Sequence, residues 1–164
     1  MRICVLCDSL TGNTEQLAQV IRQRCQGHIT TDWQQADMVF LGSWTDKGTC
    51  SEKIRQIAGE LRNKEVFLFG TCGFGGNQAY YQGVFQRTAD LLDSSNRIIG
   101  RFYCQGKMPP SVRARYAALL EQDPGNERLR LSLENYDRAL SHPDQKDLEA
   151  LKAALDELHL PLED

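Results

Sequence analysis

ICVLCDSLTGNTEQLA, residues 3–18, joins a short apolar run to a helical pattern through a polar loop. Residues 2–7 predict a buried strand. The apolar run is short, and it ends in a polar loop that contains a glycine. Apolar residues then recur at helical spacing at Leu17, Val20, Ile21 and Cys25. A strand that leads directly into a helix is the repeating unit of α/β folds.

The same order of strand, loop and helix recurs along the chain. Further apolar runs occur at residues 38–42, 66–70 and 98–104, and a weak edge strand is expected at 28–32. This cadence predicts an α/β fold in which a parallel sheet has helices on both faces. Because ligands bind beyond the carboxyl ends of parallel strands, the loops after the strands at 2–7, 38–42 and 66–70 should line a site.

The last third of the chain has a different character. Residues 107–140 carry a Pro-Pro pair and helical spacing among many arginines and glutamates, which predicts a helical insertion. Residues 144–160 predict a final packing helix that follows a capping segment and covers the sheet. We expect residues 1–164 to form a single domain.

Composition limits the classes of function. The chain has 164 residues, 41% of them hydrophobic, and 19 basic against 22 acidic side chains give a net charge of -3. This balance argues against a nucleic-acid partner, and the first apolar run is too short for a membrane span or an export signal. We therefore expect a cytoplasmic protein with reduced cysteines. Cys4 and Cys7 form a C-x-x-C, but their offset on a strand places them on opposite faces, which favours core packing.

The loop at residues 8–14 has the chemistry of a phosphate cradle. It offers the hydroxyls of Ser9, Thr11 and Thr14, free backbone N–H groups and the positive end of a helix dipole. The chain has neither the GxxxxGK[ST] loop of nucleotide triphosphatases nor a GxGxxG fingerprint. An ordinary capped turn is the alternative interpretation of this loop.

The loop resembles the phosphate loop of the flavodoxin family. The residues that match that pattern are Val5, Leu6, Ser9, Gly12, Thr14, Ala18 and Ile21, whereas Cys7 stands where an aromatic residue is usual. Further stretches, Trp44–Thr49, Leu68–Thr71 and Cys104–Lys107, are similar to the BilS-type subgroup, which is associated with bilirubin reductases.

This resemblance implies a flavodoxin-like, doubly wound five-stranded parallel sheet of order 2-1-3-4-5 with one non-covalently bound FMN. Such a protein carries electrons between redox partner proteins, a reductase donor and an acceptor enzyme similar to bilirubin reductase, as a monomer or weak dimer and with no membrane partner. It needs no catalytic residue of its own. The implied cofactor-binding residues are Ser9, Leu10, Thr11, Gly12, Asn13 and Thr14 in the first loop, Ser43, Trp44, Thr45, Lys47 and Gly48 after the strand at 38–42, and Thr71, Cys72, Gly73, Phe74 and Gly75 after the strand at 66–70.

Within that set, Trp44 and Phe74 are the expected aromatic neighbours of the flavin ring, with Tyr80 and Tyr81 as alternatives for the second face. Gly48 is the candidate for the backbone carbonyl that meets the reduced ring, because glycine permits a positive φ. Lys47 departs from the acidic surroundings usual in the family, and a cation there would make the flavin potential less negative.

Two other functions remain open. An FMN-dependent NAD(P)H oxidoreductase that reduces a quinone or small acceptor fits the same fold, and the insertion at 107–140 would then cover a substrate. The third hypothesis is a flavodoxin-like scaffold that binds no cofactor and acts only through protein contacts. The hydroxyl groups of Ser9, Thr11 and Thr14 in the first loop argue against it. His28, His142 and His159 are scattered in the sequence, so no metal is expected.

Overall fold

The computed structural model describes residues 1–160, and residues 161–164, the C-terminal end of the expected single domain, lie outside the described residues. The elements, in chain order, are β1 (Ile3–Asp8), α1 (Asn13–Arg24), the 3-10 helix η1 (Trp33–Gln35), β2 (Met38–Asp46), β3 (Thr49–Cys50), α2 (Glu52–Glu60), β4 (Glu65–Cys72), α3 (Gln78–Ala89), β5 (Arg97–Gln105), α4 (Pro110–Gln122), α5 (Glu127–Ala139) and α6 (Gln145–Asp156).

The sheet is parallel, with β1, β2, β4 and β5 side by side in that order. An isolated parallel bridge joins Ile29 to Ile3 on the open side of β1. With residues 28–32 counted as the second strand, the expected order 2-1-3-4-5 is therefore confirmed. That edge strand shrinks to one bridge because Ile29 is its only large apolar residue. The short β3 pairs antiparallel with the end of β2.

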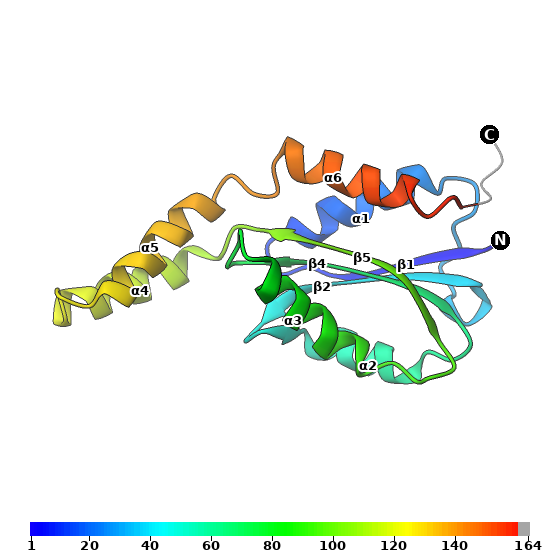
Figure 1. Cartoon of the computed structure of the whole chain (residues 1–164), viewed down its shortest axis with the longest axis horizontal. Coiled ribbons are helices and arrows are strands. Elements are labelled where there is room, and N and C mark those ends of the chain that lie inside the picture. The colour runs from blue at the N-terminus through cyan, green and yellow to red at the C-terminus, as the bar shows by residue number, and fades with distance from the viewer. Residues whose placement is uncertain (161–164) are drawn as a thin grey trace.

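Helices cover both faces of the sheet (Figure 1). The residues that face α1 and α6 include Ile3 and Val5 of β1, and they form one core cluster with Leu17 and Leu151. Cys4, between them on β1, belongs to a second cluster on the side of α2 and α3. This strict alternation follows from the two-residue period of a strand whose two faces are both buried.

The same alternation determines which face of the sheet each cysteine of the C-x-x-C pair occupies. Cys4 is buried in the cluster beneath α2, whereas Cys7 packs against the cluster beneath α1. The expectation that their side chains lie on opposite faces is confirmed, and both are free thiols. Burial raises the pKa of Cys7 to about 12, so this thiol stays protonated at neutral pH.

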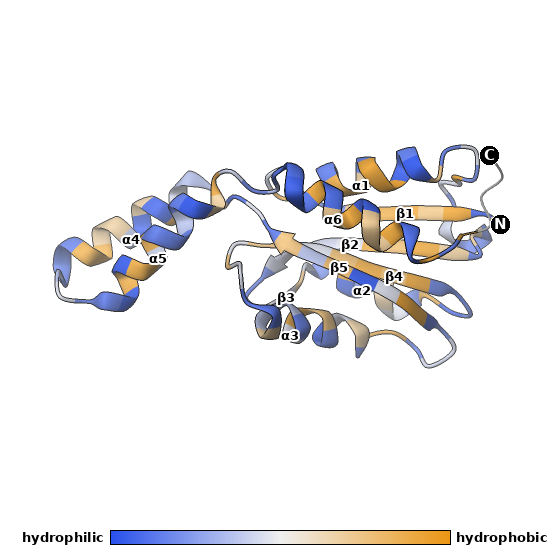
Figure 2. Cartoon of the chain, turned by 45° about the horizontal axis from the view of Figure 1, so that its top comes forward, coloured by the Kyte–Doolittle hydropathy of each residue, from blue (hydrophilic) through white to orange (hydrophobic). Residues whose placement is uncertain are grey.

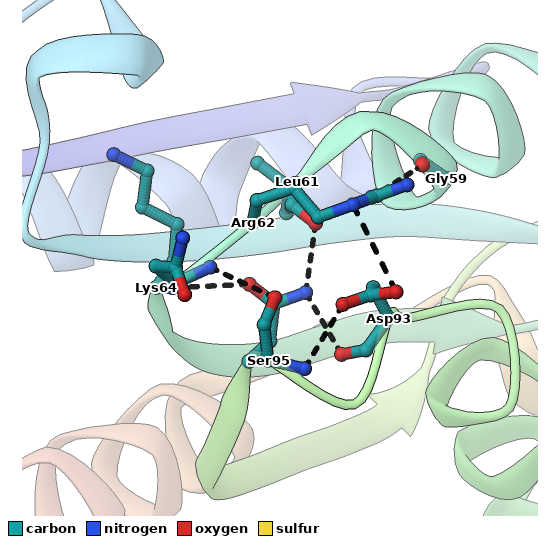
Figure 3. Close-up of polar contacts among 8 residues, drawn as sticks. Gly59, Leu61, Arg62, Lys64, Asp93 and Ser95 are labelled. Atoms are coloured by element: carbon teal, nitrogen blue, oxygen red, sulfur yellow. Dashed lines mark hydrogen bonds and ion pairs between the residues drawn. The ribbon is translucent and has the colours of Figure 1, made fainter.

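At the amino-terminal ends of β4 and β5, a network of polar contacts closes the two turns that enter these strands (Figure 3). The Arg62 guanidinium donates to the carbonyls of Gly59 and Leu61, both at 2.8 Å. The Asn96 amide donates to the Leu61 carbonyl at 2.9 Å, and its oxygen accepts from the Lys64 N–H at 3.0 Å. These bonds hold one end of the sheet and leave the opposite, carboxyl end to the functional loops.

The helical segment expected at 107–140 is a hairpin of two helices, α4 and α5, which extends away from the sheet (Figure 1). We call residues 110–139 the arm. Helix α4 has no fully buried residue, and the buried residues of α5, Asn135, Tyr136 and Ala139, lie near its C-terminal end. Apolar and polar residues alternate on the arm, in contrast to the apolar strands (Figure 2).

The final helix α6 is shorter than the expected 144–160 and packs on the sheet. Asp144 is its N-cap and forms a capping box with Asp147. Leu151 and Leu155 of this helix are buried in the cluster that α1 also covers. Among residues 1–160, no helix combines the length and the apolar character that crossing a membrane requires.

Candidate functional site

The loop between β1 and α1 has free backbone donors at the start of a helix. Gly12 is the N-cap of α1 with φ +86°, and no side chain caps this helix at that position. The Ser9 hydroxyl instead reaches across the loop and accepts from the Glu15 N–H at 3.3 Å. The N–H groups of Asn13 and Thr14 have no acceptor within residues 1–160. Two free amides at a helix N-terminus make an anion-binding position.

The side chains of this loop connect it to the chain that leaves β5. We call residues Gly106–Pro109 the strap. The Lys107 carbonyl accepts from the Thr11 hydroxyl at 3.2 Å and from the Asn13 amide at 2.8 Å. The Oδ1 atom of Asn13 is buried and has no partner among the described residues. Thr14 lies deeper, where its hydroxyl pairs with that of Thr71 at 2.8 Å.

The β2–β3 hairpin forms a wall of the site beside the β1–α1 loop and the strap. The strand β2 continues through Asp46, so Trp44 lies in a strand, beside Thr71 of β4, and not in the expected loop. Lys47 and Gly48 form the two-residue turn, with φ +50° and +83°. This is the type I′ geometry that matches the twist of a hairpin.

Hydrogen bonds orient the hairpin toward the carboxyl ends of β1 and β4. The indole N–H of Trp44 donates to the Asp8 carboxylate at 3.1 Å. The Thr45 hydroxyl donates to the Thr71 carbonyl at 2.9 Å. At the turn, the Gly48 carbonyl accepts from the Arg87 guanidinium at 2.8 Å, so α3 supports the hairpin from its far side.

Hydrogen bonds hold the loop after β4 to β5 and α5, and not to the hairpin. The Gly73 carbonyl accepts from the side-chain amides of Gln105 and Asn135, both at 3.0 Å. Phe74 is 44% exposed and packs edge-on against Tyr80, with ring centroids 6.2 Å apart.

These elements enclose a cavity of about 410 Å³ at the carboxyl end of the sheet. Nine of the sixteen implied cofactor residues line it: Leu10, Thr11, Asn13, Trp44, Thr45, Lys47, Thr71, Cys72 and Gly73. The structure does not bring the other seven to its lining: Ser9, Gly12, Thr14, Ser43, Gly48, Phe74 and Gly75. Ser9, Gly12 and Thr14 nevertheless shape the loop that does line it, through the contacts given above.

The remaining lining residues were missed by the sequence analysis. They are Asp46 of the hairpin, the strap residues Gly106, Lys107, Met108 and Pro109, and Val112, Arg115 and Tyr116 of α4. Gly106 must be small, because a Cβ there would lie 2.6 Å from the Asn13 amide. The spacing of Val112, Tyr116 and Leu119 in the sequence was a usable signal, since one apolar helix face without a buried partner indicates a surface that covers something.

The cysteine that lines the cavity is a protonated thiol. Burial raises the pKa of Cys72 to about 11, and the Thr45 hydroxyl, 3.2 Å from its sulfur, opposes that rise. A reactive cysteine requires a lowered pKa. Cys72 therefore packs this site and does not supply a nucleophile at neutral pH.

One group of potential metal ligands does come together, contrary to the scatter of histidines in the sequence. His142, Asp144 and Asp147 have ligand atoms within 4.8 Å of one another. The His142 Nδ1 atom lies 2.7 Å from the Asp147 carboxylate. That carboxylate also accepts from the Asp144 N–H at 2.8 Å, so the group is explained by the cap of α6.

Comparison with known proteins agrees with the fold. The model of the flavodoxin domain family matches residues 4–156. Two flavodoxin-like domain-containing proteins named BilS are similar over nearly their full length. The protein from Clostridioides difficile (strain CD3) is 33% identical, over 90% of each chain, and that from Clostridium symbiosum (strain WAL-14163) is 35% identical, over 93% of each chain.

Solved structures share the fold at low sequence identity. A WrbA-like flavodoxin from Agrobacterium tumefaciens superposes with a TM-score of 0.52 at 12% identity, covering 93% of this chain and 98% of that one. A flavoprotein from Lactobacillus acidophilus NCFM in complex with FMN gives a TM-score of 0.51 at 14% identity, covering 63% of this chain and 93% of that one. The family match spans almost the whole chain, and the chain belongs to the flavodoxin domain family.

Proposed function

We propose that this protein binds one FMN in the cavity at the carboxyl end of the sheet and carries electrons between partner proteins. The single observation behind the proposal is the cavity itself, which joins an anion-binding helix start to an indole wall. Membership of the flavodoxin family supports FMN, and the Lactobacillus acidophilus neighbour is an FMN complex.

The phosphate end of the cofactor fits the start of α1. The free N–H groups of Asn13 and Thr14 provide donors, and the helix dipole adds positive potential. Lys107, which lines the same cavity, places an ammonium on the strap beside this loop. The Thr11 hydroxyl and the Asn13 amide donate to the Lys107 carbonyl, so they hold the strap beside this loop and leave the backbone N–H groups as its free donors.

The ring end fits the hairpin wall. Trp44 lines the cavity and is held by the Asp8 carboxylate, so its indole face has a fixed orientation. Lys47 and Asp46 at the tip of the hairpin place one charge of each sign at the cavity. When bound, FMN supplies electron transfer in steps of one or two electrons. The protein binds and orients the cofactor and sets its charge environment.

The partners follow from this role. A reductase would supply the electrons and an acceptor enzyme would take them, and the similarity to BilS-type proteins makes an enzyme like bilirubin reductase the acceptor to test first. Asp46 and Lys47 at the hairpin tip line the cavity and are exposed, and this is where a partner would approach.

Binding is tested by titrating FMN or riboflavin with the purified protein and following flavin fluorescence. We expect FMN to bind about tenfold more tightly than riboflavin or better, because the phosphate gains charge-assisted hydrogen bonds at α1. Trp44→Ala should weaken the binding of both flavins. Its matched control is Trp33→Ala, because Trp33 lies in η1 and does not line the cavity. Equal affinities for FMN and riboflavin, or no binding, would overturn the proposal.

The mode of reduction separates the carrier from the NAD(P)H oxidoreductase. NADPH is first added alone to the FMN-loaded protein, and the visible spectrum is followed. A carrier should show no change with NADPH and two separate one-electron steps when it is titrated with a chemical reductant. Rapid bleaching by NADPH alone would establish the oxidoreductase instead.

A further inference from the structure

The cavity is lined by the aromatic side chain of Trp44 in the β2–β3 hairpin, and it is also lined by the strap and by α4. We propose that Tyr116 of the arm provides the second aromatic surface against the flavin ring, in place of Phe74 in the loop after β4. This inference rests on the proposed FMN binding. It assigns to the arm a part in building the cofactor site.

Helix α4 presents one of its faces to the cavity. Val112, Arg115 and Tyr116 all line it. These positions are spaced by three and four residues, so they form a single stripe along the helix. Tyr116 is half-buried on a helix that has no fully buried residue. Its ring also lies beside the Arg115 guanidinium, 5.7 Å from the ring centroid.

Phe74, by contrast, does not line the cavity. Its ring packs against Tyr80, and 44% of the residue is exposed to solvent. The loop that carries it is closely packed from below: a Cβ at Gly73 would lie 2.5 Å from the Met108 sulfur, and one at Gly75 would lie 2.5 Å from the Gln105 amide. The loop therefore has little room to move toward the cavity without displacing the strap.

Helix α4 is held in place at its start. The strap is fixed by bonds from the Gly106 N–H to the Cys72 carbonyl at 2.9 Å and from the Lys107 N–H to the His142 carbonyl at 3.1 Å. Pro109 and Pro110 follow directly and restrict the backbone that enters α4. Tyr116 is less than two helical turns beyond this anchored point, so its position against the cavity is determined.

Helix α5 supports α4 through an ion pair. The Arg113 guanidinium pairs with the Asp137 carboxylate at 3.1 Å. Asn135, two residues before Asp137, donates to the Gly73 carbonyl at 3.0 Å. The base of the arm is thereby joined to the same β4 loop that lines the cavity, and Tyr116 and Trp44 both line that cavity.

The test compares Tyr116→Ala, Tyr116→Phe and Phe74→Ala. Affinities for FMN and for riboflavin are measured by fluorescence, and the fold of each variant is checked by circular dichroism. Tyr116→Ala should weaken both flavins by the same factor, on the order of five- to tenfold, because a ring contact is lost and the phosphate contacts remain. Tyr116→Phe should restore the affinity, and Phe74→Ala should stay within about twofold of the parent protein.

The outcomes distinguish this inference from the proposed function. If the parent chain binds no FMN, the proposed function itself fails. If the parent binds FMN and Tyr116→Ala binds both flavins as tightly, or if Phe74→Ala is the variant that loses affinity, the assignment of Tyr116 is overturned while FMN binding stands. Loss of FMN affinity with unchanged riboflavin affinity in Tyr116→Ala would also overturn it, because the contact would then be to the phosphate.

Discussion

Lys47 shows how a single residue couples backbone geometry to cofactor chemistry. It occupies the first left-handed position of the hairpin turn, which places its exposed side chain at the tip of the wall that holds Trp44. The side chain lines the cavity. A cation at this position stabilises negative charge that develops on a reduced ring, and its effect is moderated by solvent.

The charge of Lys47 should affect the midpoint potential of the bound flavin. Lys47→Ala should make the midpoint potential of the bound flavin more negative, on the order of tens of millivolts, because one positive charge near the ring is lost. Lys53→Ala is the control, since Lys53 is an exposed lysine of α2 that does not line the cavity. Spectroelectrochemical titration measures both. A potential that stays constant or rises in Lys47→Ala would show that this ammonium does not act on the ring.

Of the last three helices, α6 packs on the sheet and stabilises the fold, whereas α4 and α5 extend away from it. Helix α6 buries Leu151 completely between the sheet and α1. On the arm, Leu119 and Leu131 are 44% and 51% exposed. Buried leucines of α6, after His142, therefore stabilise the fold, whereas exposed leucines of the arm, before His142, contribute little to its stability.

This difference predicts unequal effects of the same truncation. Leu151→Ala should lower the free energy of unfolding by about 2–5 kcal/mol, as is usual when a fully buried leucine is shortened. Leu131→Ala, at an exposed position of α5, should change it by no more than about 0.5 kcal/mol. Urea denaturation of the two variants beside the parent protein measures the difference. Equal losses would mean that the arm packs against the body in solution.

At the scale of the whole molecule, the buried thiols link stability to pH. Burial raises the pKa of Cys25 to about 11 and that of Cys72 to about 11, from an ordinary value of 9.0. The folded protein therefore keeps these protons at pH values where the unfolded chain has released them. The stabilisation is complete below about pH 9 and is lost as the pH rises toward the folded values.

We accordingly expect stability to be flat near neutral pH and to fall above about pH 9, by up to about 1.4 kcal/mol per pH unit for each such thiol. Urea midpoints determined under reducing conditions at a series of alkaline pH values measure this slope. Cys25→Ala should make the slope shallower, whatever it does to stability at neutral pH. An unchanged slope would show that Cys25 does not contribute to the alkaline loss.

The strand order followed from the resemblance to the flavodoxin family, whereas the sequence by itself determined the α/β class and the loop at the start of α1. Each of these depends on patterns within a few residues: apolar runs such as residues 3–7 and 66–70, helical spacing, and the glycine that begins α1. Burial on both faces of a parallel sheet makes such runs unmistakable, and a strand that feeds a helix leaves donors free at the helix start.

Only the tertiary structure decided which residues complete the cavity. The contact of the Lys107 carbonyl with Thr11 and Asn13 joins residues more than ninety positions apart, and no local pattern specifies it. The direction of the arm, and with it the place of Tyr116, depends on that contact and on the bonds of Asn135 to the β4 loop. Local periodicity specifies which side of a helix is apolar, whereas long-range hydrogen bonds specify what that side covers.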